Sequence, residues 1–337
     1  MFDKQAVRNY NGRVKEIIGR QEKGETMIQI FMTEDDAIHQ KDEVQNGCWM
    51  ALTDPTATEI LEISEAYNID PDHLRAPLDE EERSRIEAEE NYTLILVDIP
   101  SIEERSGKDW YVTIPLGIIM TEQMMITVCL EETPILTAFM DGRVKEFYTY
   151  MKSRFILQIL YRNASQYLQY LRVIDKKSDV VEQKLHKAQK NRELMELLEL
   201  EKSLLYFSTS LRSNEVVLEK LMKYEKIKKY PEDEELLEDV IIENKQAIEM
   251  ANIYSGNLNV TTEAVASVIS NNLNIVMKLL TTITLVMAIP TMVASFYGMN
   301  VRGIPFGEHP YGFWIVLGFT AVVSMVVTLI FSKKDLF

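Results

Sequence analysis

Two apolar segments near the C-terminus constrain the fold of this chain more than any other feature. They cover residues 279–297 and 313–331 and flank a short loop, residues 298–312. Neither segment contains Asp, Glu, Lys or Arg, and each approaches the roughly 20 apolar residues that a helix needs to cross a bilayer. We therefore expect two transmembrane helices.

A set of residues, nearly all of them polar or small, recurs along the first apolar segment, and before it, at alternating spacings of three and four. They are Glu263, Ser267, Ser270, Asn274, Met277, Thr281, Thr284, Ala288, Thr291, Ser295 and Gly298. This spacing places them on one face of a helix. Lipid cannot satisfy polar groups, so such a stripe must face a partner helix or water. One or two Ser or Thr hydroxyls commonly bond to their own helix or to a neighbour, but a stripe this continuous favours a water-filled path.

The first segment ends in Tyr297-Gly298-Met299-Asn300, and a second span and a Lys-Lys tail follow it. In these features the chain resembles the CorA family of divalent-cation transporters, whose members have two transmembrane helices per chain and a Gly-Met-Asn motif at the end of the first. The resemblance covers essentially the whole chain. Two helices cannot enclose a pore, so a conduit needs several chains around an axis. The resemblance implies that this assembly is a funnel-shaped homopentamer in the lipid bilayer.

The resemblance also implies roles for individual residues. Gly298, Met299 and Asn300 would form the selectivity filter at the outer mouth, where amide oxygens can accept hydrogen bonds from the water around Mg²⁺. The alternative for Asn300 is a polar cap at the end of a helix. Met277 and Leu280 would form an apolar gate, although Leu280 lies one position off the stripe and plain helix packing is the alternative. The pore lining would consist of Ser295, Thr291, Ala288, Thr284, Thr281 and Asn274.

A regulatory metal site is a further implication of the resemblance. Asp239 lies where the family's stalk helix carries a carboxylate that binds a cation between subunits, and Glu90 lies at the matching position before a strand. Facing carboxylates repel each other unless a divalent ion bridges them, so falling cytosolic Mg²⁺ would loosen the closed pentamer. Alternatively, Asp239 simply belongs to the acidic first turns of its helix.

The loop after the predicted filter departs from the family pattern. The best-known pattern has an acidic residue two positions after the Asn and then Met-Pro-Glu-Leu, whereas Arg302 and the residues 304–307 (Ile-Pro-Phe-Gly) occupy those places here. An acidic ring at the mouth is therefore missing or displaced to Glu308. Lys333 and Lys334 match the family's basic ring only in part, and membrane topology alone requires lysines at that position.

Charge and composition limit the partners and the location. The chain has 52 Asp and Glu against 36 Lys and Arg, a formal net charge of −16, which argues against nucleic acid as a partner because phosphate binding needs a basic patch. Residues 1–20 lack the apolar region of a signal peptide, and lysines follow the positive-inside pattern at Lys278 and after the second span. We expect a multi-pass plasma-membrane protein with both termini in the cytosol. Cys48 and Cys129 are predicted to be reduced core residues.

No catalytic constellation is visible in the sequence. Its four histidines are scattered: His39, His73, His186 and His309. Metalloprotease, phosphate-loop, nucleophile-elbow and paired-Cys motifs are all missing. We therefore expect neither an enzyme nor an organic cofactor. Acidic residues of the long helical segments, such as Glu196 and Glu199, are interpreted as solvated surface.

The residues as a whole predict an α+β membrane protein. Short apolar runs predict strands at 27–33, 47–52, 92–99, 110–120 and 124–130, and helices are expected to begin at Asp54-Pro55-Thr56 and at Asp70-Pro71. The expected organisation is a cytosolic α/β layer domain (1–142), a long-helix hairpin (143–230), a stalk helix of roughly 100 Å continuous with the first span (231–297), an external loop (298–312), a second span (313–332) and a basic tail (333–337).

These features predict a CorA-like channel that passes hydrated Mg²⁺, with Co²⁺ and Ni²⁺ as further candidates, into the cytosol and closes when intracellular Mg²⁺ binds between subunits. One alternative keeps the fold and changes the ion to Zn²⁺. An alternative of another class is a non-conducting two-span sensor or scaffold. A scaffold does not need a continuous polar stripe, so the stripe discriminates between these classes.

Overall fold

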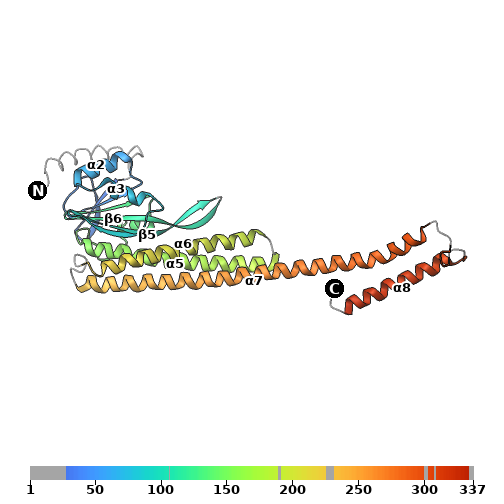
Figure 1. Ribbon diagram of the computed structural model, residues 1–337. Coiled ribbons are helices and arrows are strands. Elements are labelled where there is room, and N and C mark those ends of the chain that lie inside the picture. Colours follow the sequence, from blue (N-terminus) through green and yellow to red (C-terminus); the bar gives the residue numbers. More distant parts are fainter. Residues whose placement is uncertain are drawn as a thin grey trace. The chain divides into compact units, whose positions relative to one another are not determined.

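The computed structural model describes residues 28–105, 107–188, 191–224, 231–299, 303–306 and 309–333. It divides into two compact units, Met1–Asn259 and Val260–Phe337. The first unit contains a β-sheet with helices on both faces, and the second contains the two apolar helices predicted from the sequence (Figure 1).

A seven-stranded sheet forms the centre of the first unit. Its strands are β1 (Ile28–Glu34), β2 (Ala37–Lys41), β3 (Trp49–Thr53), β4 (Arg85–Ala88), β5 (Tyr92–Arg105), β6 (Lys108–Thr121) and β7 (Met125–Cys129). Across the sheet they follow the order β2-β1-β3-β7-β6-β5-β4. The pair β3 and β7 is parallel, and the other neighbouring pairs of these described strands are antiparallel. The layers of strands and helices agree with the predicted layer domain, and the structure adds that the sheet is mixed and mainly antiparallel.

The sequence analysis found the five inner strands and missed the two edge strands. Residues of β3 and β7 are buried on both faces of the sheet and form continuous apolar runs. By contrast, every residue of β2 and β4 is exposed or partly exposed, and both strands carry charged residues. An edge strand pairs on one side only and is often charged, so its sequence gives no clear apolar signal.

Short helices cover one face of the sheet. They are α2 (Ala57–Tyr67), α3 (Pro71–Arg75) and the 3-10 helix η1 (Ala76–Leu78). Thr56 caps α2 in a capping box with Glu59, and the Asp70 side chain accepts a hydrogen bond from the first turn of α3. Both helix starts agree with the prediction, because caps are local features of the sequence. A further helix, α4 (Pro134–Met140), was not predicted.

Long helices cover the other face of the sheet (Figure 1). They are α5 (Lys152–Ala188), α6 (Asn191–Leu221) and the first part of α7 (Pro231–Tyr297). Trp49 is fully buried here, 5.0 Å from the ring centroid of Phe155, and its indole N–H donates to Thr127 Oγ1 at 2.9 Å. Leu237 and Val240 of α7 belong to the same core. This core therefore holds the start of α7 against the sheet domain.

Both cysteines are buried and free, as predicted. Burial raises the pKa of the Cys129 thiol to about 11. A thiol that stays protonated at neutral pH is a poor nucleophile and a poor metal ligand, so the structure agrees with a core role.

The second unit contains the end of α7 and the helix α8 (Gly312–Lys333). Both helices are long enough and apolar enough to cross a membrane, and their bounds lie within a residue or two of the predicted spans. Pro290 lies inside α7, which continues past it to Tyr297. Neighbouring turns and side chains commonly compensate for a proline in a membrane helix.

Candidate cation pathway

The residues predicted to line a pore all lie on α7, and all are exposed in the single chain: Asn274, Thr281, Thr284, Ala288, Thr291 and Ser295. A groove follows this face over about four turns. Four of these residues line it, Thr284, Ala288, Thr291 and Ser295, and apolar side chains form its borders: Ile283, Met287, Met292 and Phe296. The structure thus brings together the residues that the three-and-four spacing predicted.

The threonine hydroxyls of the stripe donate to their own helix. Thr281, Thr284 and Thr291 donate to the carbonyl oxygens four residues earlier, at 2.8, 2.8 and 2.9 Å. This is the alternative that the sequence analysis gave for isolated hydroxyls. These hydrogen bonds leave the hydroxyl oxygens able to accept further hydrogen bonds, because each oxygen has two lone pairs. Each threonine therefore still presents an acceptor, which is the group that the outward-pointing hydrogens of a hydrated cation need.

The side of α7 that faces away from the stripe is the covered side of this helix in the second unit. Thr282 is buried, and Val286, Ile289 and Val293 are half-buried. On α8 the covered residues recur with the same spacing, at Val316, Thr320, Val323 and Val327, and α8 is the other described helix of this unit. At 3.6 residues per turn, the stripe is centred roughly 150° around α7 from its covered face. Helix α8 therefore leaves the stripe open.

The predicted gate residues are also exposed on α7. The exposed fractions of Met277 and Leu280 are 57% and 58%. Three residues correspond to about 300° around a helix, so these side chains point within about 60° of each other. Leu280 therefore shares the side of the stripe although it is one position off the spacing.

The end of α7 carries the first part of the predicted filter. The N–H of Gly298 donates to the carbonyl of Ala294 at 2.9 Å, and Met299 is half exposed. Tyr297 donates its hydroxyl to the carbonyl of Pro305 at 3.1 Å, so the helix end is tied to the loop. Asn300 lies outside the described residues, as do Arg302, Gly307, Glu308 and Lys334.

Close backbone packing closes the loop before α8. A Cβ at Gly312 would overlap the carbonyl group of Phe306, and Phe306 itself has a left-handed φ of 63°. Only glycine fits such an approach. The loop is therefore a defined turn in its described part, which positions the end of α7 relative to the start of α8.

The predicted regulatory carboxylates lie at two exposed positions of the first unit. Glu90 lies in the turn between β4 and β5, and Asp239 lies on the solvent side of α7. Their exposure leaves both carboxylates accessible to another chain. By contrast, Asp233, one and a half turns earlier on α7, is buried and paired with Arg154 at 3.1 Å. The sequence analysis did not find this pair, because residues 154 and 233 are joined only by tertiary packing.

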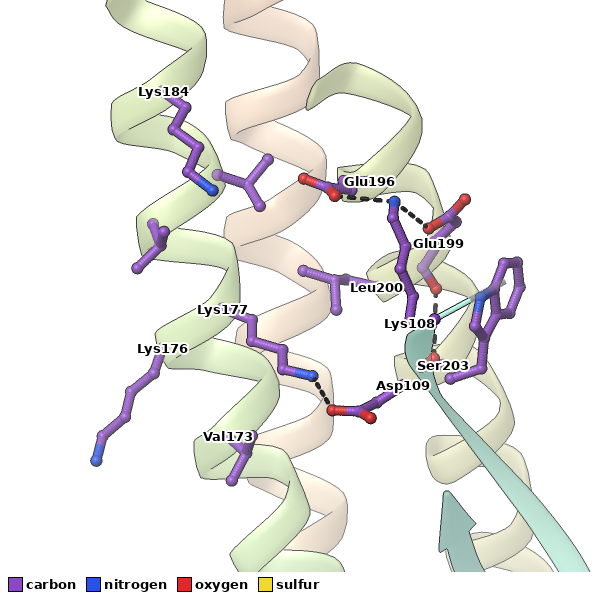
Figure 2. Close-up of a pocket in the computed structure, with 14 residues that line it drawn as sticks. Lys108, Asp109, Val173, Lys176, Lys177, Lys184, Glu196, Glu199, Leu200 and Ser203 are labelled. Atoms are coloured by element: carbon purple, nitrogen blue, oxygen red, sulfur yellow. Dashed lines mark hydrogen bonds and ion pairs between the residues drawn. The ribbon is translucent and has the colours of Figure 1, made fainter. Parts of the chain in front are cut away.

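A hollow of 530 Å³ lies between the tip of the β5–β6 hairpin and the helices α5 and α6 (Figure 2). Lys108 points between Glu196 and Glu199, at 2.8 and 3.6 Å, and Lys177 contacts Asp109 at 2.9 Å. The hydrogen bond that Lys108 donates to Glu196 raises the pKa of Lys108 and lowers the pKa of Glu196. The side chains of Glu196 and Glu199 are 24% and 29% exposed, so they lie at the surface as interpreted, and both also pair with Lys108. These charges fasten the hairpin tip to both helices.

Comparisons with known proteins agree with this arrangement. A family model described as "CorA-like Mg2+ transporter protein" matches residues 44–334. A relative from Methanocaldococcus jannaschii, named cobalt/magnesium transport protein CorA, is 29% identical over 295 residues, which are 85% of this chain and 90% of the relative. A relative of the same name from Thermotoga maritima is 21% identical over 294 residues, 85% of this chain and 82% of the relative.

A solved structure extends the similarity to nearly the whole chain. The complete structure of the CorA magnesium transporter from Methanocaldococcus jannaschii matches with a TM-score of 0.80 at 25% identity. The match covers 93% of this chain and 99% of the solved one. The two apolar helices and the sheet domain therefore belong to a single known architecture.

Proposed function

This chain belongs to the CorA-like Mg²⁺ transporter family, and on that premise we propose that it conducts hydrated Mg²⁺, and also Co²⁺ or Ni²⁺, through a pore lined by α7. As a member of this family it is a membrane transporter and not an enzyme. The single observation that carries the proposal is the stripe on α7, which is polar or small, continuous and left open by α8.

The pore is an assembly of copies of this chain. Lipid does not satisfy the oxygens of Thr284, Thr291 and Ser295, and the described part of one chain supplies two helices that could cross a membrane. Placing the stripe on a central axis of a homopentamer satisfies these oxygens with water and leaves α8 on the lipid side. The apolar borders of the groove then pack against neighbouring copies of α7, as apolar side chains do.

The filter of this pore consists of Gly298, Met299 and Asn300. Mg²⁺ gives up its water reluctantly, so a ring of amide oxygens that accepts hydrogen bonds from that water admits the ion without holding it too tightly to leave. Further along the axis, the acceptor oxygens of Thr291 and Thr284 extend the same kind of contact. Met277 and Leu280 narrow the axis with apolar side chains and close it by excluding water.

Regulation takes place at the surface between subunits. Glu90 and Asp239 are exposed in the single chain, and intracellular Mg²⁺ bridging them across the interface holds the pore closed. Loss of that ion leaves two facing carboxylates that repel each other. The chain lies in the plasma membrane with both termini in the cytosol, which puts this site on the side where Mg²⁺ is regulated.

The test is Mg²⁺ uptake into liposomes that contain the purified full chain and a Mg²⁺-sensitive dye. Wild type is expected to take up Mg²⁺, and Asn300→Ala is expected to lose uptake while it keeps the size of the oligomer. Asn271→Ala is the matched control, because Asn271 is exposed on α7 about 120° away from the stripe. Its uptake should equal that of wild type.

The outcomes separate the alternatives. Flux of Zn²⁺ without flux of Mg²⁺ would assign the chain to the zinc alternative, which the names of the two relatives do not favour. No divalent flux in wild type would refute conduction and support a sensor or scaffold. Equal loss of uptake in Asn300→Ala and Asn271→Ala would refute the filter while leaving conduction standing.

A further inference from the structure

Three side chains that can bind metal meet in the first unit, and none of them belongs to the candidate cation pathway. The ligand atoms of His73, Glu87 and Glu89 lie within 4.8 Å of one another. His73 is on α3, Glu87 is on β4, and Glu89 follows that strand directly. The sequence analysis treated His73 as one of four scattered histidines, because the residues of this group become neighbours only when α3 folds over the β4–β5 hairpin.

Two of the three ligands, His73 and Glu87, each have a hydrogen-bonding partner that fixes the orientation of the side chain. His73 Nδ1 lies 2.7 Å from the hydroxyl oxygen of Tyr92, which also accepts from the backbone N–H of Asp70 at 3.1 Å. When Nδ1 carries the proton and donates it to Tyr92, the lone pair of Nε2 points at Glu87. Glu87 in turn accepts a hydrogen bond from Arg85 through Oε1, which leaves Oε2 for another partner.

This arrangement has the form of a metal site with its supporting shell. Metal-ligating histidines usually donate their second nitrogen to an oxygen, and ligating carboxylates are themselves hydrogen-bonded. The ring of Tyr92 is buried, and the N–H of Glu89 donates to the carbonyl of Tyr92 at 2.9 Å. A backbone hydrogen bond therefore links Glu89, the third ligand, to Tyr92, the residue that orients His73.

The distance between two of the ligand atoms fits a shared ion. His73 Nε2 and Glu87 Oε2 are 3.2 Å apart. Two atoms that each lie about 2.0 Å from a tetrahedral ion are about 3.3 Å apart. Without a metal, the same two atoms contact each other directly at this distance.

We propose that His73, Glu87 and Glu89 form a binding site for a divalent transition metal, such as Co²⁺, Ni²⁺ or Zn²⁺, within each subunit. The imidazole selects this class of ion, because nitrogen ligands suit these metals whereas Mg²⁺ takes oxygen ligands. The site is partly exposed, with side-chain exposures of 14% for His73 and 35% for Glu87, so an ion can enter from solvent. The proposal does not depend on conduction through α7.

The test is calorimetric titration of the purified full chain with Co²⁺ in the presence of excess Mg²⁺, which saturates sites made of oxygen ligands. Wild type is expected to bind one Co²⁺ per chain. His73→Gln is expected to weaken this binding more than about tenfold, and Tyr92→Phe about 10- to 100-fold, because loss of a supporting partner has that effect. His39→Gln is the matched control, since His39 is exposed on β2, and it should bind as wild type does.

Three results would overturn the proposal: no Co²⁺ binding by wild type in excess Mg²⁺, unchanged affinity in His73→Gln, or equal weakening in His39→Gln. Thermal unfolding of each variant shows whether it is folded, and Glu89→Gln provides an independent substitution at an exposed position. Failure here is distinct from failure of the transport proposal, which is measured by Mg²⁺ uptake and by Asn300→Ala.

Discussion

Replacing Arg154 by Met should destabilise the first unit and loosen the start of α7. The Arg154 guanidinium contacts Asp233 with an Nε to Oδ1 distance of 3.1 Å, and the side chains are 24% and 2% exposed. Removing the partner of a fully buried carboxylate costs about 3–5 kcal/mol. The exposure of Arg154 lets water reach the pair, and the positive end of α7 stabilises Asp233 by about 0.5–1 kcal/mol. We therefore expect a loss of about 2–3 kcal/mol.

Thermal unfolding of the full chain in detergent, followed by tryptophan fluorescence, measures this loss. Trp49 is a suitable reporter, because it is fully buried and packs against Phe155, the residue after Arg154. For a unit of this size, 1 kcal/mol lowers the midpoint temperature by about 2–4 °C. The expected decrease for Arg154→Met is therefore about 4–12 °C.

Two variants make the interpretation specific. In Arg154→Met/Asp233→Asn the buried charge is gone as well, so most of the loss should be recovered. Arg143→Met removes a pair with Asp141 whose side chains are 61% and 50% exposed, and an exposed pair contributes only about 0–1 kcal/mol. A decrease in Arg154→Met no larger than in Arg143→Met, or no recovery in the double variant, would refute the reasoning.

Further predictions concern pH, packing and flux. Burial raises the pKa of Asp98, so the folded state favours the protonated carboxyl group. Stability should therefore fall as the pH rises from about 4 through that pKa. Asp98→Asn should flatten the dependence of the melting temperature on pH, and an identical slope would contradict this. Gly117→Ala would place a Cβ against the ring of Pro77 and should lower the free energy of unfolding by about 1–3 kcal/mol. Gly256 lies in open space on α7, so Gly256→Ala should raise the melting temperature. Thr291→Val should lower Mg²⁺ flux about 2- to 10-fold, the equivalent of one net hydrogen bond, at unchanged oligomer size; unchanged flux would remove Thr291 from the pathway.

The sequence by itself determined the membrane helices and the stripe. Apolar length, the absence of charge and the helical period are local properties, so α7 and α8 have the predicted bounds to within a residue or two. Helix starts at Thr56 and Asp70 were predictable for the same reason, because a cap acts within three residues of itself. The family follows from these elements together with the Gly298-Met299-Asn300 motif.

Only the tertiary structure decided the order of the strands, the two edge strands and the contacts between distant charges. Arg154 meets Asp233, and Lys108 meets Glu196, across about 80 residues of sequence. The grouping of His73 with Glu87 has the same origin. Any of the chain's many acidic residues could pair with any base as far as composition is concerned. Packing of α5, α6 and α7 on the sheet selects among them, because it brings only certain charges within reach of one another and burial makes an unpaired charge costly.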